Sequence, residues 1–152
     1  MLIIAHRGLI HGPNDPHLEN EPNHITQLLQ SGWHVEVDVR REQDVWYLGH
    51  DTTTHKIDTS FLLQLGLWIH AKDHAASGTL QELRREHHYV NYFWHESDAR
   101  VLTSQGHWWT QPGHPLVQNS VAVMPEWHVQ DLKECMDWPC VAICTDWGSK
   151  LQ

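Results

Sequence analysis

The stretch His34–Asp51, HVEVDVRREQDVWYLGHD, organises the fold of this 152-residue chain. In its first half, valine alternates with Glu36, Asp38 and Arg40. Side chains along a strand point alternately to opposite faces, so this pattern predicts a strand with one apolar and one charged face. Glu36 and Asp38 then point the same way, roughly 6.5 to 7 Å apart. Either they are solvated on an edge strand, or a cation or strong donors lie between them.

The second half of the stretch returns towards these acids. After a polar turn, the apolar run Val45–Leu48 predicts a return strand, which ends in Gly49-His50-Asp51. The imidazole of His50 is therefore expected near Glu36 and Asp38. Paired carboxylates suit hard divalent ions such as Mg²⁺ or Ca²⁺. This segment thus predicts a metal site with a histidine beside it.

Strands and helices alternate on both sides of this segment. Leu2–Ala5 is a short apolar run typical of a strand buried on both faces, and Pro22 opens a helix that ends at Gly32. Strand, helix and strand form a βαβ unit, which implies a parallel sheet with a right-handed crossover. Further strands are predicted over 67–72, 89–95, 107–110, 121–124 and 141–146, and further helices over 59–65, 79–86, 97–102 and 129–135.

This alternation predicts a single α/β domain over residues 1–152, built as a closed or nearly closed (β/α) barrel of the TIM type. A full barrel typically needs ~250 residues, so its helices must be shortened or missing here. A small doubly wound sheet is the alternative. Active sites of barrels lie at the carboxyl ends of the strands. The barrel is favoured because polar residues fall at or near such ends: His6, Glu36, Asp38, His70, Lys72, His95 and Asp146.

The charge balance argues against an extended nucleic-acid surface. Ten Lys and Arg stand against nineteen Asp and Glu, a formal net charge of −9, whereas phosphate backbones are bound by basic surfaces. One or two local cations can still hold a small phosphate-bearing molecule. Three cysteines without C-x-x-C spacing fit a reducing, cytoplasmic setting, and no apolar run approaches the ~20 residues of a membrane span. The oligomeric state stays open.

Several short motifs resemble the glycerophosphodiester phosphodiesterases, a family of the wider phospholipase-C-like phosphodiesterase barrels. These motifs follow the family's order and lie near its spacings, and they cover about the first third of the chain: Ile4-Ala5-His6-Arg7-Gly8, Glu19-Asn20, Glu36-Val37-Asp38-Val39 and Gly49-His50-Asp51. Two later matches are short. Ile69–Lys72 resembles a family strand of pattern Glu-x-Lys, and Thr145-Asp146-Trp147 resembles a closing Thr-Asp-aromatic.

The resemblance implies a metal-dependent phosphodiesterase acting on a small, glycerophosphodiester-like substrate. It makes His6 and His50 the acid/base pair, and Arg7 and Lys72 contacts to the phosphate. Trp147 follows the last strand and is expected at the pocket mouth as a further substrate contact. In the family an adjacent substrate hydroxyl can be the nucleophile and give a cyclic phosphate, while direct attack by water is the other route. Both a hydrolase and a cyclising lyase therefore fit the resemblance.

The same resemblance makes Glu36, Asp38 and His70 ligands of one divalent ion, with His70 where the family has a Glu. Mg²⁺ or Ca²⁺ is expected first, with Mn²⁺ or Zn²⁺ as alternatives because an imidazole ligand makes the site softer. The histidine and the short chain also fit a degenerate barrel that binds phosphate and metal without turnover. A third interpretation is a zinc-stabilised scaffold, which would unfold on removal of the metal.

Overall fold

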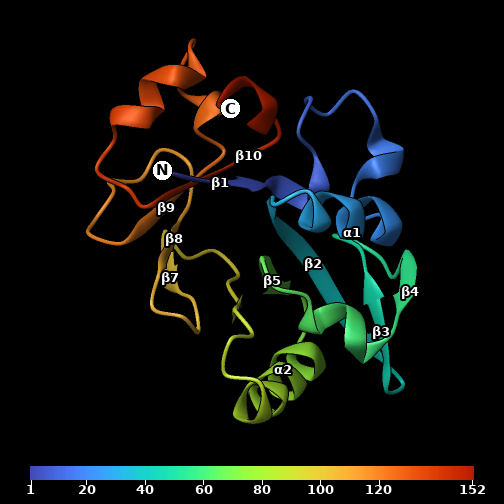
Figure 1. The fold of residues 1–152 in the computed structure, drawn as a ribbon. Helices are drawn as coiled ribbons and strands as arrows, with labels where there is room; N and C mark the ends of the chain where they lie inside the picture. The colour runs from blue at the N-terminus through green and yellow to red at the C-terminus, as the bar shows by residue number, and fades with distance from the viewer.

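A computed structural model describes all of residues 1–152. Ten strands form one curled sheet (Figure 1). They are β1 Leu2–Ala5, β2 His34–Glu42, β3 Val45–Leu48, β4 His55–Ile57, β5 Leu67–Ala71, β6 Tyr92–Phe93, β7 Arg100–Leu102, β8 Trp108–Thr110, β9 Ser120–Val123 and β10 Ala142–Thr145. Seven of them are parallel, in the order β8-β9-β10-β1-β2-β5-β6. The strands β3, β4 and β7 extend this sheet by antiparallel pairing.

The parallel order follows the chain, as it does in a barrel, but the sheet does not close between β6 and β8. Ser104 bridges the opening, since its N–H donates to Tyr92 O at 2.8 Å and Tyr92 N–H donates to Ser104 Oγ at 2.9 Å. On the inner side, the rings of Phe93 and Trp109 stack with centroids 4.4 Å apart. The predicted α/β class is confirmed, and the sheet is a curled half-barrel.

Two α-helices cover the sheet. The first, α1, spans Pro22–Gln30 and packs on β2, and the second, α2, spans His74–Glu86 and packs on β2 and β5. Proline suits the start of α1 because the first-turn N–H groups have no partner within the helix. The Glu21 carboxylate accepts hydrogen bonds from the N–H groups of Asn23 and His24. The predicted start of this helix is confirmed.

Helix α2 does not start at Thr79 as predicted. Asp73 is its N-cap, with a carboxylate oxygen 2.7 Å from Ala76 N. Thr79 Oγ1 lies inside the helix and donates to Ala75 O. An aspartate cap satisfies a free N–H at the true start, so the Thr-x-x-Glu pattern over 79–82 is not used as a cap.

The remaining predicted helices have other structures. The segment 97–102 was predicted as a helix, but it contains β7, which pairs with β8 as a hairpin. The segments 59–65 and 129–135 contain 3₁₀ turns, η3 Thr59–Leu63 and η5 Leu132–Asp137. Four further 3₁₀ turns are η1 His6–Gly8, η2 Pro16–Leu18, η4 Pro125–Trp127 and η6 Gly148–Lys150. The short connections leave α1 and α2 as the only α-helices, as the chain length implied.

The alternation along β2 places valines on one face of the strand and acidic side chains on the other. Val35, Val37 and Val39 are fully buried in one apolar cluster with residues of α1 and α2, such as Ile25 and Leu80. The inner face of the curl holds a second cluster that contains Trp68, Phe93 and Trp109. The acids of β2 point to this inner face, because they alternate with the valines.

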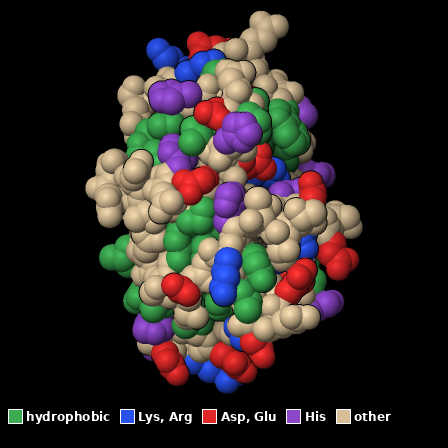
Figure 2. Space-filling view, turned by 90° about the vertical axis from the view of Figure 1, so that its right-hand side faces the viewer, with side chains coloured by type: hydrophobic (Ala, Val, Ile, Leu, Met, Phe, Trp, Pro, Cys, Tyr) green, Lys and Arg blue, Asp and Glu red, His purple; other side chains and the backbone are tan.

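The surface agrees with the charge balance of the sequence. On the face in Figure 2, basic side chains are scattered among acidic side chains and histidines. No helix has the length and apolar character that crossing a membrane would need.

Candidate active site

Three buried side chains converge towards the carboxyl ends of β2 and β5. Glu36 and Asp38 lie on β2, and the strand register pairs Asp38 with His70 of β5. His70 Nδ1 lies 3.2 Å from Asp38 Oδ1 and 3.8 Å from Glu36 Oε1. One ligand atom from each residue can be chosen so that all lie within 4.8 Å of one another. The structure thus brings together the three residues predicted as metal ligands.

The donor set fits a divalent ion. Asp38 Oδ1 is buried without a hydrogen-bond partner, because its contact with His70 lacks hydrogen-bond geometry. A buried carboxylate oxygen without a donor is costly, and a cation would satisfy it. The ring of His70 is nearly parallel to those of Phe93 and His95, with centroids 4.9 and 4.4 Å away, which fixes its plane. Two carboxylates and one imidazole suit Mg²⁺, Mn²⁺ or Zn²⁺.

Asp38 is held in place by Arg7 and Asn20. Arg7 Nε forms an ion pair with Asp38 Oδ2 at 2.9 Å, and Arg7 Nη1 donates to Glu19 Oε1 at 2.6 Å. Asn20 Nδ2 donates to the same Asp38 oxygen at 3.1 Å, and Asp38 N–H donates to Asn20 Oδ1 at 3.0 Å. Arg7 has a φ of 52°, a conformation that an arginine rarely adopts. The turn after β1 therefore accepts local strain and points the guanidinium at β2.

Burial acts to raise the pKa of both acids of β2, but their pKa values shift in opposite directions overall. Burial favours a raised pKa of Asp38, but contact with His70 and the charges of Arg7 and Lys72 outweigh it and hold that pKa well below its usual range. Lys72 Nζ lies 3.8 Å from Asp38 Oδ1. Burial and the neighbouring Asp38 raise the pKa of Glu36. Burial lowers the pKa of His70 to about 4, so its imidazole is neutral at pH 7, as metal binding requires.

The carboxylate of Asp146, directly after the last strand, orients His6. His6 Nδ1 lies 2.8 Å from Asp146 Oδ1, which leaves Nε2 free for a substrate. Burial lowers the pKa of His6, but the hydrogen bond to Asp146 and the charge of Glu36 outweigh it, so that the pKa is raised. Glu126 Oε1 in turn accepts hydrogen bonds from Thr145 Oγ1 at 2.7 Å and Asp146 N at 2.9 Å. His6 therefore has the fixed orientation that a general acid or base needs.

His50 lies on the same cavity but is more exposed. Gly49 N–H donates to Asp38 O at 3.0 Å, which holds the following His50 beside β2. A side chain at Gly49 would lie 2.0 Å from Thr52 O, so the turn requires glycine. His50 Nδ1 lies 2.8 Å from Asp51 Oδ1. The predicted acid/base pair, His6 and His50, thus opens onto one space.

All but one of the residues predicted for the site line a single cavity of about 490 Å³. Those that line it are His6, Arg7, Glu36, Asp38, His50, His70 and Lys72. Trp147 is not among the lining residues. Its ring packs against Gly12 and lies 3.8 Å from Lys150 Nζ. Asp146 lines the cavity, but the side chain of Trp147 points away from it. The structure therefore does not place Trp147 at the pocket mouth.

Several residues that line or support the cavity had no predicted role. His95 and Asp146 lie at strand ends, and this position was the signal that marked them as candidates. Asn20 belongs to a quoted motif, but its bonds to Asp38 depend on a contact between distant segments. Nothing in the local pattern around Glu126 or Trp127 marked them, because their importance depends on how the turn after β9 packs against β10.

The cavity combines the elements needed to bind an anionic group and move a proton beside it. Arg7 and Lys72 supply positive charge, the cluster of Glu36, Asp38 and His70 could hold a metal ion, and His6 supplies a carboxylate-supported imidazole.

No protein-family model matches the chain, and comparison with curated proteins and with solved structures gives no match either. The resemblance to glycerophosphodiester phosphodiesterases therefore stays an interpretation of short motifs.

Proposed function

We propose that this protein is a metal-dependent phosphodiesterase that cleaves a small phosphodiester. The observation that carries the proposal is the buried cluster of Glu36, Asp38 and His70, whose ligand atoms lie within 4.8 Å of one another. Arg7 and Lys72 contact the same Asp38 carboxylate. A cavity with a candidate metal site, two cations and two imidazoles suits an anionic substrate that needs proton transfer at two oxygens.

The residues divide the work of cleavage between them. A divalent ion held by Glu36, Asp38 and His70 would stabilise negative charge on the phosphoryl oxygens as a Lewis acid. Arg7 and Lys72 orient the phosphate and share in this stabilisation. His6 and His50 are the acid/base pair: one deprotonates the attacking hydroxyl, and the other protonates the leaving oxygen. Asp146 is a positioning residue, since it acts through His6.

We also infer that the curled sheet is a reduced (β/α) barrel. Its parallel strands follow the chain order, and the site lies towards their carboxyl ends, where barrels of this type build active sites. Only α1 and α2 are helices of the kind that connects the strands of a full barrel, and several other connections contain only 3₁₀ turns.

The test is turnover of a panel of phosphodiesters by metal-loaded protein. The panel contains glycerophosphodiesters, lysophospholipids, cyclic nucleotides and bis-p-nitrophenyl phosphate, each with Mg²⁺, Ca²⁺, Mn²⁺ or Zn²⁺. We expect turnover of at least one diester, lost in His50→Ala and kept in His17→Ala, which changes an exposed histidine outside the cavity. No turnover by folded, metal-loaded protein would reject the proposal. Diester binding that is unchanged by His50→Ala, without turnover, would instead support a binding module.

A further inference from the structure

The cavity has chemically different walls. Its charged and histidine side chains come from β2 and β5 and from the segments that follow β1, β3, β5, β6 and β10. Apart from Leu9 and Pro13, its apolar lining comes from β8, β9 and the segments that follow them: Trp109, Pro112, Val123, Met124 and Trp127. A phosphodiester has one anionic centre and two ester arms. With the phosphate at the charged wall, one arm can extend over the apolar wall.

Trp127 is the notable residue of this wall, because 66% of it is exposed although it lines a cavity. The turn that carries it is firmly anchored. Pro125 is buried, and the carboxylate of Glu126 accepts hydrogen bonds from Thr145 and Asp146. Trp127 N–H donates to Met124 O at 3.2 Å. The turn thus fixes the backbone beneath an exposed indole, so no backbone segment has to be ordered when a ligand contacts the ring.

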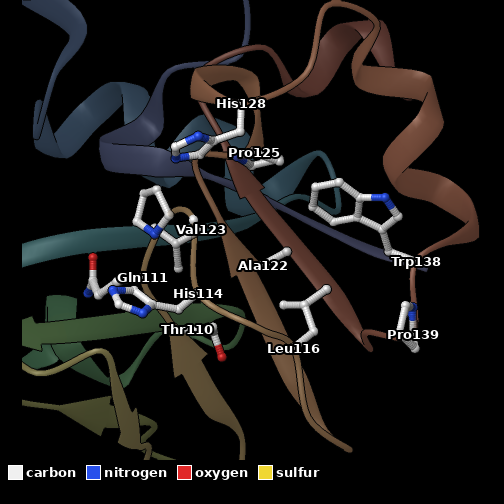
Figure 3. Close-up of a pocket in the computed structure, with 12 residues that line it drawn as sticks. Thr110, Gln111, His114, Leu116, Ala122, Val123, Pro125, His128, Trp138 and Pro139 are labelled. Atoms are coloured by element: carbon white, nitrogen blue, oxygen red, sulfur yellow. The ribbon is translucent and has the colours of Figure 1, made fainter.

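The apolar character continues past this wall. Gln111, Pro112 and Val123 also line a second hollow of about 360 Å³ beside β9 (Figure 3). Figure 3 shows Ala122 on β9 at its floor and Trp138 across from His128. No Asp, Glu, Lys or Arg side chain lines this second hollow, although Thr110, Gln111, His114 and His128 bring polar atoms to it.

We propose that the substrate carries a bulky apolar group on one ester arm and that this group packs against Trp127. The inference rests on the proposed function, which places the phosphate between Arg7, Lys72 and the metal cluster. Apolar contact with a large aromatic surface gives affinity without further charged contacts. Trp127 is therefore a specificity-determining residue that favours aryl or alkyl diesters over diesters with two small arms.

The experiment measures binding of three stable diesters by calorimetry: dimethyl phosphate, methyl hexyl phosphate and methyl phenyl phosphate. Every protein carries His50→Ala, so that no ligand is consumed, and Mn²⁺ is present. We expect the hexyl or phenyl ester to bind about tenfold more tightly than dimethyl phosphate, equivalent to about 1.4 kcal/mol. Adding Trp127→Ala should remove most of this difference, whereas Trp108→Ala, at an exposed tryptophan outside the cavity, should keep it.

The possible results separate this inference from the proposed function. Equal affinity for the three esters, no binding of any of them, or a preference that survives Trp127→Ala would overturn the inference. A hexyl preference without a phenyl preference would support it and identify an alkyl arm, and the reverse would identify an aryl arm. Turnover of methyl phenyl phosphate by the unsubstituted protein is measured separately. Selective binding without any turnover would support the apolar arm and reject catalysis.

Discussion

At the residue scale, Asp38 has the densest set of partners in the site. Arg7, Asn20, Lys72 and His70 all contact its carboxylate. Asn20 is the only one of these without charge or metal-binding chemistry, and it forms two hydrogen bonds with Asp38 from a buried position. Its loss would leave the buried Asp38 N–H without a partner and would remove one of the two donors that contact Asp38 Oδ2.

We expect Asn20→Ala to lower the free energy of unfolding by about 1–3 kcal/mol, the usual cost of an unsatisfied buried polar group. Urea denaturation measures the change. Asn119→Ala is the matched control, because Asn119 also has a positive φ (64°, against 54° for Asn20) but is exposed. Equal losses in the two variants would show that only backbone conformation matters and would contradict the role given to the hydrogen bonds.

The pair of His6 and Asp146 makes a pH-dependent prediction for metal-free protein. The pKa of His6 in the folded state is raised above the ordinary value near 6.5. Folding therefore favours the protonated form of this imidazole. The resulting stability is fully present below pH 6.5 and is lost as the pH rises through the folded pKa. Asp146→Asn should therefore destabilise the protein more at pH 6 than at pH 9.

Two measurements check this prediction. Urea denaturation at both pH values gives the stability difference, and NMR titration of the His6 ring gives its pKa, which should fall in Asp146→Asn. A stability difference that does not change with pH, together with an unchanged His6 titration, would contradict the assigned pairing.

Much of the site could be predicted at this scale, because side chains along a strand alternate between its two faces. Glu36 and Asp38 lie on the part of β2 that runs parallel to β5, and the register of the two strands brings them next to His70 and Lys72 at the end of β5. Trp147 could not be placed in the same way, since its direction depends on the turn after β10. The buried position of Asn20 depends on contact between β2 and a loop, for which no local periodicity exists.

At the scale of elements, helix α2 shows how a local motif can mislead. The Thr-x-x-Glu pattern at Thr79 predicts a helix start, but Asp73 caps the helix earlier and also accepts a hydrogen bond from Arg41 N–H of β2 at 3.0 Å. Asp73 thus links the start of a helix to the sheet. Which of two competing caps is used depends on this tertiary contact, which sequence alone does not reveal.

Two substitutions distinguish these caps. Asp73→Ala should destabilise the protein by about 1–2 kcal/mol, because an N-cap is lost. Thr79→Ala should change stability by at most about 0.5 kcal/mol, since alanine is a good helix former at a half-buried position inside a helix. Thermal denaturation compares the two. A larger loss in Thr79→Ala than in Asp73→Ala would mean that the helix begins at Thr79 after all.

At the scale of the whole molecule, the half-barrel and the metal cluster are largely separate. The two main apolar clusters contain sixteen and nine buried residues, and none of the three predicted metal ligands belongs to them. The chain length correctly implied shortened helices. The opening between β6 and β8 was not predictable, because it depends on β7 forming a hairpin with β8 where a helix was expected.

This separation predicts that metal is not needed for folding. Treatment with EDTA should leave the circular dichroism spectrum unchanged and lower the melting temperature only modestly, because the apolar clusters stay intact. Apo protein at the same pH and ionic strength is compared with protein given Mn²⁺ again. Cooperative unfolding on chelation would favour a metal-stabilised scaffold over a catalytic site.

The central claim is that Glu36, Asp38 and His70 form the metal centre of a phosphodiesterase. The most direct measurement is hydrolysis of bis-p-nitrophenyl phosphate while metal-stripped protein is titrated with Mn²⁺. We expect the rate to rise from background to a plateau at one equivalent. Asp44→Asn, at an exposed acid beyond β2, should behave in the same way, and folded Asp38→Asn should stay at background. A full rate in EDTA, or in Asp38→Asn, would contradict the claim.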